Sequence, residues 1–382
     1  MSKNIVICCD GTGNQVSGDL TNVLKLHRCV RKDEGQRAFY DPGIGTIGDS
    51  NPWRQRWNRA KGAFGLATGA GLDDNILDAY RFLVEHYQAG DRLYFFGFSR
   101  GAYTVRALAG LIHAIGILHP DQANLAPYAL TAYKRAGEEG RFGIAWDFAR
   151  VTGSARATIH FMGVWDTVAS MIVPRRDRFY LPSLGTLPFT RTNPSVRAFR
   201  HAMAIDERRR MFRLNHWNGD TQFVIDPFSK PPQTEPQDCQ QVWFAGVHAD
   251  VGGGYAESES GLSKLPLVWI AQEALAHGLR LDHGMLDHLA LGTPVAGGRR
   301  QYVAPDASGM LHRSLKGAWW LIEFFPKNVR WREWSKRLGL LGYYLPMGEP
   351  RAIAADALIH PSVQERRAAL PAYRPPNVPN AM

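Results

Sequence analysis

Residues 92–103 read RLYFFGFSRGAY, an apolar run that leads into a serine with a glycine two positions away on each side. The first five residues are typical of a buried strand, and apolar residues recur at helical spacing from Ala102 to Ile112. A G-x-S-x-G pattern between a strand and a helix is typical of a nucleophile elbow, a tight turn that exposes the serine hydroxyl. Ser99 is therefore the candidate nucleophile, and the helix that follows favours negative charge at its N-terminus.

Similar units are expected on both sides of this one. Helices are expected at 73–88, where apolar residues recur at helical spacing, and at 262–279. Further apolar strands are expected at 4–9, 37–40, 157–164 and 241–247. Apolar strands that alternate with helices predict an α/β fold, with a mostly parallel sheet covered by helices on both faces.

Two polar residues after other strands complete a candidate triad. Asp166 and His248 each follow an apolar strand, and ligand sites in such sheets lie outside the carboxyl ends of the strands. The chain order Ser99, Asp166, His248 is the order used by α/β-hydrolases. We assign Ser99 as nucleophile, His248 as general base and Asp166 as the carboxylate that orients His248. The rival bases are His201, His216 and His360, and the rival acids are Asp226 and Asp250.

The loop Asp10-Gly11-Thr12-Gly13-Asn14 is expected to supply part of an oxyanion hole. One donor should be the N–H of Arg100, which follows the nucleophile, and the other the N–H of Gly11 or Thr12. The same glycines suggest a phosphate loop, but Val16 stands where a G-x-G-x-x-G motif needs glycine. We therefore expect no nucleotide cofactor.

A metal is not expected either. His248 and Asp250 could form a metal pair, but no third ligand follows at helical spacing. The four cysteines are too few and too scattered for a disulfide framework.

The expected organisation is one α/β domain over residues 1–370. Residues 171–240 are rich in proline and arginine and are expected to form a lid-like insertion over the site. Residues 371–382 are expected to form a loosely ordered, proline-rich tail. Residues 313–345 interleave six Trp and Phe side chains with Lys and Arg, a composition that suits either core packing or contact with a lipid surface.

Composition limits the remaining classes. With 45% hydrophobic and 21% charged residues, the chain is expected to be globular. The start, MSKNIVICCD, lacks a signal-peptide pattern, and no 18-residue apolar run is present, so we expect synthesis in the cytoplasm and no membrane span. The net charge of +10 favours anionic partners. Nucleic acid is not expected, because only 313–337 combines basic and aromatic residues as base recognition requires.

The sequence resembles a known family in several motifs. The nucleophile segment Phe96-Gly97-Phe98-Ser99-Arg100-Gly101-Ala102-Tyr103 resembles that of the Tle1-like phospholipase effectors of type VI secretion. The other matches are Asp10-Gly11-Thr12-Gly13-Asn14, Tyr40-Asp41-Pro42-Gly43-Ile44-Gly45-Thr46, Gly163-Val164-Trp165-Asp166-Thr167-Val168, Ala204-Ile205-Asp206-Glu207-Arg208-Arg209, the run from Trp243 to Tyr255, and His360-Pro361-Ser362-Val363. They keep the same order and span residues 10–363.

The resemblance implies an α/β-hydrolase core and a triad at Ser99, Asp166 and His248. It also implies hydrolysis of phospholipid acyl esters, contact with a membrane surface, and type VI delivery into the periplasm of a target cell, with a secretion adaptor and an immunity protein as partners. Two alternatives stay open. The chain could be a stand-alone carboxylesterase or lipase that is not secreted, or an inactive binding module on a hydrolase fold.

Overall fold

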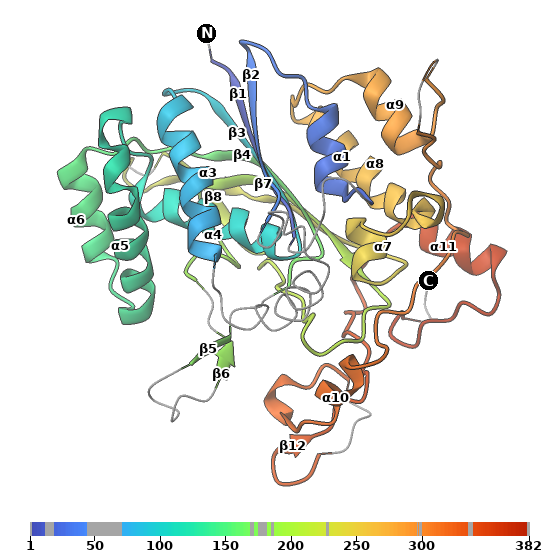
Figure 1. Cartoon of the computed structure of the whole chain (residues 1–382). Coiled ribbons are helices and arrows are strands. Elements are labelled where there is room, and N and C mark those ends of the chain that lie inside the picture. Colours follow the sequence, from blue (N-terminus) through green and yellow to red (C-terminus); the bar gives the residue numbers. More distant parts are fainter. Residues whose placement is uncertain are drawn as a thin grey trace, which may run out of the picture.

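A seven-stranded parallel sheet organises the computed structural model of the chain (Figure 1). The structure describes residues 2–11, 19–43, 71–168, 172–174, 182–184, 187–226, 229–295, 297, 300–334 and 339–379. The strand order is β13-β10-β7-β4-β3-β1-β2, and every neighbouring pair is parallel. The strands are β1 Asn4–Cys9, β2 Gln36–Asp41, β3 Arg92–Phe98, β4 Ile159–Trp165, β7 Val196–Ala204, β10 Asp238–Phe244 and β13 Leu358–Ile359. The expected α/β class with a mostly parallel sheet is confirmed.

Helices cover both faces of the sheet because successive strand residues point to opposite sides. Ile5 and Ile7 of β1 pack with one group of helices: α3 Leu72–His86, α4 Arg100–Ile115, α5 Ala126–Glu139 and α6 Gly143–Thr152. Val6 and Cys8 pack with the other group: α1 Asn22–Cys29, α8 Gly261–Ala276 and α9 His283–Leu291. The strands are therefore buried on both sides, as their continuous apolar sequences predict.

One expectation about the middle of the chain is wrong. Residues 171–240 do not form an insertion as a whole, because β7 lies within this range and pairs with β4 on one side and β10 on the other. Two hairpins in the range lie outside the central sheet: β5 Ile172–Pro174 with β6 Pro182–Leu184, and β8 Gln222–Asp226 with β9 Gln233–Pro236. Only these hairpins and their connections are left as candidates for a lid.

The C-terminal part packs onto the end of the sheet. Helix α11 Pro361–Ala369 follows β13, and the Tyr373 hydroxyl donates to Asp206 Oδ2 at 2.7 Å. The Asn377 side chain donates to the Ile205 carbonyl at 3.1 Å. Residues 371–379 are therefore held by specific contacts rather than loosely ordered, and 380–382 lie outside the described residues.

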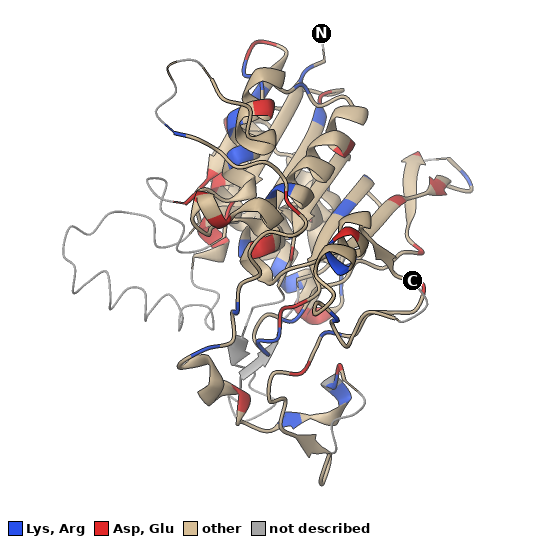
Figure 2. Cartoon of the chain, turned by 90° about the vertical axis from the view of Figure 1, so that its right-hand side faces the viewer, with Lys and Arg blue, Asp and Glu red and all other residues tan. Residues whose placement is uncertain are grey.

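Charge is dispersed along the described ribbon. Figure 2 shows Lys and Arg interspersed with Asp and Glu over the helices and loops. The net charge of +10 is therefore a sum over the molecule and does not by itself mark a binding face.

The turn from β3 to α4 is tightly packed against β1. A Cβ atom on Gly101 would lie 2.0 Å from the Cys9 carbonyl oxygen and 2.6 Å from the Asp10 carbonyl oxygen. Both neighbours are backbone atoms, which cannot rotate away as a side chain would. Glycine at this position lets the start of α4 approach the end of β1.

We predict that Gly101→Ala lowers the free energy of unfolding by about 3 kcal/mol, because the added methyl group forces the two backbones apart. Gly143→Ala is the matched control: Gly143 likewise lies in the first turn of a helix, and a Cβ atom added there would have no atom within 4 Å. This control should change stability by less than about 1 kcal/mol. Chemical denaturation measures both, and equal effects would contradict the packing argument.

Candidate active site

Ser99 lies at the sharp turn between β3 and α4. Its backbone has φ 57° and ψ −118°, a sparsely populated conformation for a residue with a side chain. A Cβ on Gly97 would lie 2.5 Å from the Gly101 carbonyl oxygen, so the first glycine of the motif permits the turn to close. The Ser99 N–H donates to the Trp165 carbonyl at 3.1 Å, which ties the turn to the end of β4. This is the geometry expected of a nucleophile elbow.

Asp166 and His248 meet at the carboxyl ends of the strands. Asp166 follows β4, and His248 is the first residue of helix α7 His248–Gly252, just after β10. Nδ1 of His248 lies 2.5 Å from Oδ2 of Asp166, and both side chains are buried. A carboxylate at Nδ1 fixes the imidazole ring and leaves Nε2 free of a proton, as a general base requires.

Arg351 was not expected from the sequence, but it holds Asp166 in place. Its Nη1 donates to Asp166 Oδ1 at 2.6 Å and its Nη2 to Oδ2 at 3.0 Å, while the Ala204 N–H donates to Oδ1 at 2.9 Å. Burial alone would raise the pKa of Asp166, but Arg351 and His248 together hold that pKa well below its ordinary value. Asp166 therefore stays ionised beside the histidine.

The His248 ring packs against two aromatic rings, and its backbone is hydrogen-bonded. Its centroid lies 4.6 Å from that of Phe98 and 4.8 Å from that of Phe212, the latter edge-on. The His248 N–H donates to Glu207 Oε2 at 3.2 Å. Burial lowers the pKa of His248, and the hydrogen bond with Asp166 counteracts this effect only in part. The imidazole is therefore neutral near pH 7.

Glu207 is a second residue whose role the sequence did not indicate. Its carboxylate accepts from the backbone N–H groups of Arg208 and Arg209 and from the Arg209 guanidinium, at distances from 2.8 to 3.0 Å. The same carboxylate accepts from the Ser314 hydroxyl at 2.9 Å. Burial opposes the charge, but Arg209 outweighs it and lowers the pKa of Glu207 to about 2.

The three predicted residues follow the carboxyl ends of β3, β4 and β10, strands of the same parallel sheet. Ser99 is bonded through its backbone to the residue before Asp166, and the ring of Phe98, its chain neighbour, packs on His248. Among the described contacts, no hydrogen bond joins the Ser99 hydroxyl to the His248 ring. Catalytic hydrogen bonds often form only when substrate is bound, so the triad stays a prediction for Ser99.

The predicted oxyanion-hole donors, Gly11, Thr12 and Arg100, differ in what the structure describes of them. The Gly11 N–H donates to Asp10 Oδ1 at 2.7 Å, so this amide is already used within its own loop. Asp10 is in turn held by the hydroxyls of Thr21 and of Tyr40, the latter at 2.9 Å. Thr12 lies outside the described residues. Arg100 begins α4, where amides lack intrahelical acceptors, and it keeps its place as a predicted donor.

The rival bases have other structural partners. Nε2 of His201 accepts from the Thr167 N–H at 3.1 Å, and this histidine is buried inside β7. His360 caps α11, where its Nδ1 accepts from the Ser362 N–H at 3.3 Å. His216 packs against Trp243 with ring centroids 6.1 Å apart.

The rival acids are also accounted for. Asp250 Oδ1 lies 2.6 Å from Nδ1 of His312, and Asp250 Oδ2 accepts from the Val247 N–H at 3.0 Å. Asp226 ends β8, in a hairpin outside the central sheet. Within the described ranges, no group of three His, Cys, Asp or Glu side chains is arranged to hold a metal ion.

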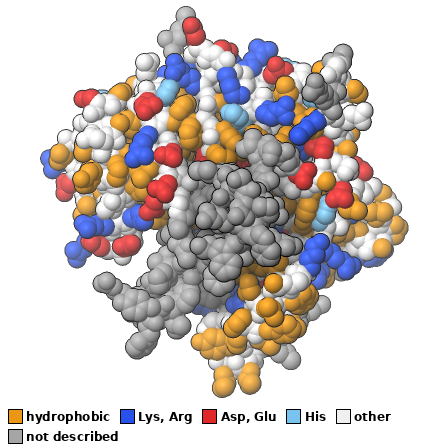
Figure 3. All heavy atoms as spheres, viewed as in Figure 1, with side chains coloured by type: hydrophobic (Ala, Val, Ile, Leu, Met, Phe, Trp, Pro, Cys, Tyr) orange, Lys and Arg blue, Asp and Glu red, His pale blue; other side chains and the backbone are white. Residues whose placement is uncertain are grey.

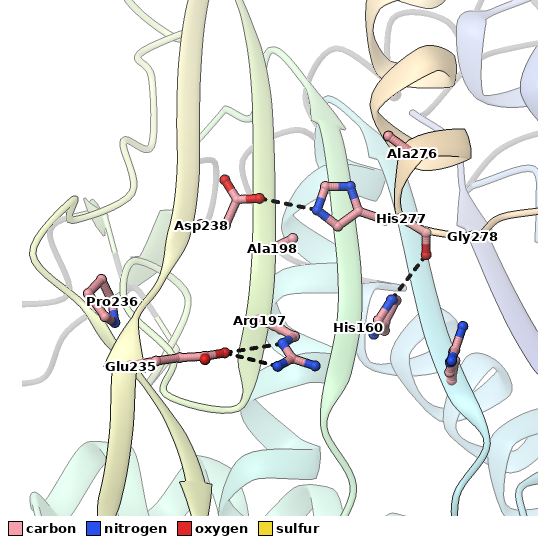
Figure 4. A pocket seen from close by; sticks show the side chains of 10 residues that line it. His160, Arg197, Ala198, Glu235, Pro236, Asp238, Ala276, His277 and Gly278 are labelled. Atoms are coloured by element: carbon pink, nitrogen blue, oxygen red, sulfur yellow. Dashed lines mark hydrogen bonds and ion pairs between the residues drawn. The ribbon is translucent and has the colours of Figure 1, made fainter.

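A pocket of about 450 Å³ lies at the amino ends of the strands, at the end of the sheet opposite the candidate site (Figure 4). Arg92 and Asp238, which begin β3 and β10, are among its lining residues. Arg197 pairs with Glu235 at 3.1 Å, and Asp238 with His277 at 3.1 Å. The pocket is separate from the Asp166–His248 pair.

Comparisons with known proteins identify the family of the chain. A family model described as "T6SS, Phospholipase effector Tle1-like, catalytic domain" matches residues 3–273. Uncharacterized protein YEL023C of Saccharomyces cerevisiae is 31% identical over 410 aligned residues, which cover 75% of this chain and 59% of the yeast protein.

Two solved structures are more distant. One is an uncharacterized protein from Pseudomonas aeruginosa, with 20% identity and a TM-score of 0.40, covering 73% of this chain and 46% of that one. The other is the Tle1 effector bound to the VgrG spike from the type 6 secretion system, with 18% identity and a TM-score of 0.37, covering 69% of this chain and 53% of that one. The chain thus spans about half of these solved proteins.

The parallel α/β sheet and the family match together define the class of the protein, an α/β domain that matches a catalytic-domain model. The chain belongs to the Tle1-like catalytic domain family of type VI secretion phospholipase effectors. No helix in the described part of the chain has the length and apolar content needed to cross a membrane.

We predict that Glu207 makes folding acid-sensitive. Its pKa falls from an ordinary 4.5 to about 2, so it stabilises the folded state fully above pH 4.5 and loses this effect as the pH falls towards 2. The contribution at neutral pH is about 3 kcal/mol. Glu207→Gln should therefore flatten the dependence of the unfolding free energy on pH between 5 and 2, measured by urea denaturation.

The control for this measurement is Glu138→Gln, which changes an exposed glutamate on α5. It should leave the acid dependence as in the wild type. If both variants lose stability with acid as steeply as the wild type, Glu207 does not carry the linkage.

Proposed function

We propose that this protein is a serine hydrolase that cleaves the acyl esters of phospholipids. The observation that carries the proposal is the buried Asp166–His248 pair, 2.5 Å apart, beside a strained serine elbow. A neutral imidazole oriented by an ionised carboxylate is the arrangement that activates a serine hydroxyl. The family match supports a lipid ester as the substrate.

The residues have the following roles in the proposed reaction. His248 Nε2 takes the proton as Ser99 Oγ attacks the ester carbonyl, and the resulting oxyanion accepts hydrogen bonds from the Arg100 N–H and a second amide of the 10–14 loop. His248 then gives the proton to the leaving alcohol, which departs as a lysophospholipid. Water, activated by the same histidine, releases the fatty acid from Ser99 and restores the enzyme.

Delivery is a separate part of the proposal. The family description names type VI effectors, and this supports synthesis in the cytoplasm followed by export into a target cell. A secretion spike or adaptor and an immunity protein are then the partners. The yeast relative shows that sequences of this kind also occur outside bacteria, so ester hydrolysis is the more general part of the proposal.

We predict that Ser99→Ala abolishes labelling by a fluorophosphonate probe and lowers the turnover of p-nitrophenyl butyrate by about 10⁴-fold or more, because the nucleophile is lost. His248→Ala should lose a similar factor, since the triad acts as a unit. Circular dichroism checks that both variants fold. Labelling that persists in Ser99→Ala would refute the nucleophile, and an unlabelled wild type would favour an inactive binding module.

We predict that Arg351→Gln moves the acid limb of the kcat/KM profile to higher pH, because the coupled Asp166–His248 pair loses a cation that opposes its protonation. Arg351→Lys keeps the positive charge but cannot form the bidentate contact, so it should shift the acid limb by an intermediate amount. Arg208→Gln, at an exposed arginine nearby, is the control. A lower rate with an unmoved acid limb would mean that Arg351 acts only on folding.

A further inference from the structure

Residues 313–334 and 339–349 form an extension that we call the apolar arm. It includes helix α10 Trp319–Glu323 and the short strands β11 Lys327–Asn328 and β12 Tyr343–Tyr344. Figure 1 places α10 and β12 apart from the central sheet, and Figure 3 shows hydrophobic side chains gathered over the same region. The exposed large hydrophobic residues of the arm are Trp320, Leu321, Phe324, Phe325, Leu340, Leu341, Tyr343 and Leu345.

The tip of the arm is an unusual turn. Leu340 and Tyr343 exchange both backbone hydrogen bonds, at 2.7 and 3.0 Å, so Leu341 and Gly342 form a two-residue loop. Both have positive φ, 51° and 78°, as in a type I′ turn. Asparagine, aspartate and glycine are the usual residues at the first position, because leucine is strained there. This leucine is also 90% exposed.

Folding in water gives no reason for this choice. A strained backbone and an exposed leucine side chain both disfavour Leu341 as a solvent-facing residue. Its side chain gains free energy only if the tip enters an apolar phase. The neighbouring exposed residues, Phe324 and Phe325, would gain in the same way.

The charges around these side chains are mostly positive. Arg313 and Lys316 are exposed. Each of the three acidic residues in the arm is bonded within the protein. Glu323 accepts from the Arg210 N–H at 2.8 Å, Glu333 pairs with Arg213 at 3.0 Å, and Glu349 pairs with Lys327 at 2.5 Å. The surface that surrounds the hydrophobic side chains therefore attracts anionic groups.

The arm is joined to the candidate active site by a short chain of rings. Trp319 packs edge-on against Phe212 with centroids 5.5 Å apart, and Phe212 packs against His248 at 4.8 Å. The Arg210 guanidinium donates to the Ile322 carbonyl at 3.1 Å and ties α10 to the segment that carries Phe212. These contacts link helix α10 of the arm to the ring of His248.

We propose that the apolar arm docks the protein on an anionic phospholipid bilayer, with Leu341 and Phe325 entering the boundary between headgroups and acyl chains. Exposed aromatic and aliphatic side chains combined with Lys and Arg suit this interface. The step from docking to catalysis rests on the proposed function, since it presents lipid esters to His248. Docking itself does not depend on hydrolysis.

The test uses the full chain carrying Ser99→Ala, so that lipid is bound but not cleaved. Co-sedimentation is measured with vesicles of equal parts phosphatidylglycerol and phosphatidylcholine, and with phosphatidylcholine alone. We expect binding to the anionic vesicles that weakens with added salt. Leu341→Asn, which suits the turn and should not harm folding, is expected to weaken binding by about tenfold. Arg313→Glu combined with Lys316→Glu should remove the preference for phosphatidylglycerol.

Val151→Asn is the matched control, because Val151 is 78% exposed on α6, away from the arm. It should bind vesicles as the parent does. Equal binding by Leu341→Asn and the parent, or no binding to either vesicle, would overturn the proposal. A lipid-free dimer that Leu341→Asn converts to monomer would identify a second copy of the chain as the occupant instead.

A final measurement separates docking from catalysis. With Ser99 intact, Leu341→Asn should cleave soluble p-nitrophenyl butyrate at the wild-type rate but lose about tenfold on phosphatidylglycerol vesicles. Vesicle binding without any esterase activity would refute the proposed function and leave docking standing. Esterase activity with no effect of Leu341→Asn on vesicle binding or vesicle hydrolysis would refute docking and leave the proposed function standing.

Discussion

The buried carboxylate of Asp166 holds together the segments that meet at the carboxyl ends of the strands. Removing a charge from water is costly, and an unpaired buried carboxylate would take up a proton. Here the charge is kept by donors from separate parts of the chain: the His248 ring after β10, the Ala204 N–H at the end of β7, and two N–H groups of Arg351. One ionised group therefore fixes the relative positions of these segments.

This arrangement also determines the state of the histidine. Burial between two aromatic rings favours neutral imidazole, while the ionised Asp166 fixes its orientation through Nδ1. Arg351 lies outside the range matched by the family model, which ends at residue 273. The segment beyond that range is thus part of the candidate site in this chain, because without it the carboxylate would lose its only arginine among the described contacts.

Sequence patterns predicted the parts of the site that follow apolar strands. Ser99, Asp166 and His248 could be found because each comes after a continuous hydrophobic run, and the structure places all three at one edge. Strand β7 was missed because Arg200 and His201 interrupt its apolar pattern. Both side chains are buried: Arg200 pairs with Asp238 and Glu273, and His201 accepts from Thr167. Such partners exist only once the chain has folded.

The residues that contact Asp166 and His248 gave a weaker signal for the same reason. Arg351 belongs to no motif, and only the fold shows that its guanidinium reaches Asp166. Glu207 lies within one of the family motifs, Ala204 to Arg209, but nothing in the spacing shows that its carboxylate bonds the His248 backbone. Patterns of hydrophobicity locate strand ends, whereas contacts between distant polar residues need three-dimensional coordinates.

Backbone strain links the candidate site to the apolar arm. Within the described residues, five non-glycine residues have positive φ, and they include Ser99, Asp166, Leu341 and Met347. Two of these carry the proposed chemistry, and two lie in the arm. Strained backbone persists only where the surrounding structure holds it, and it concentrates at sites of function. At Ser99 and Asp166, dense packing and hydrogen bonds hold the strain, but Leu341 is almost fully exposed and packing does not explain it. An apolar environment outside the protein would make this turn favourable, and the Trp319–Phe212–His248 contacts link helix α10 of the same arm to the candidate base.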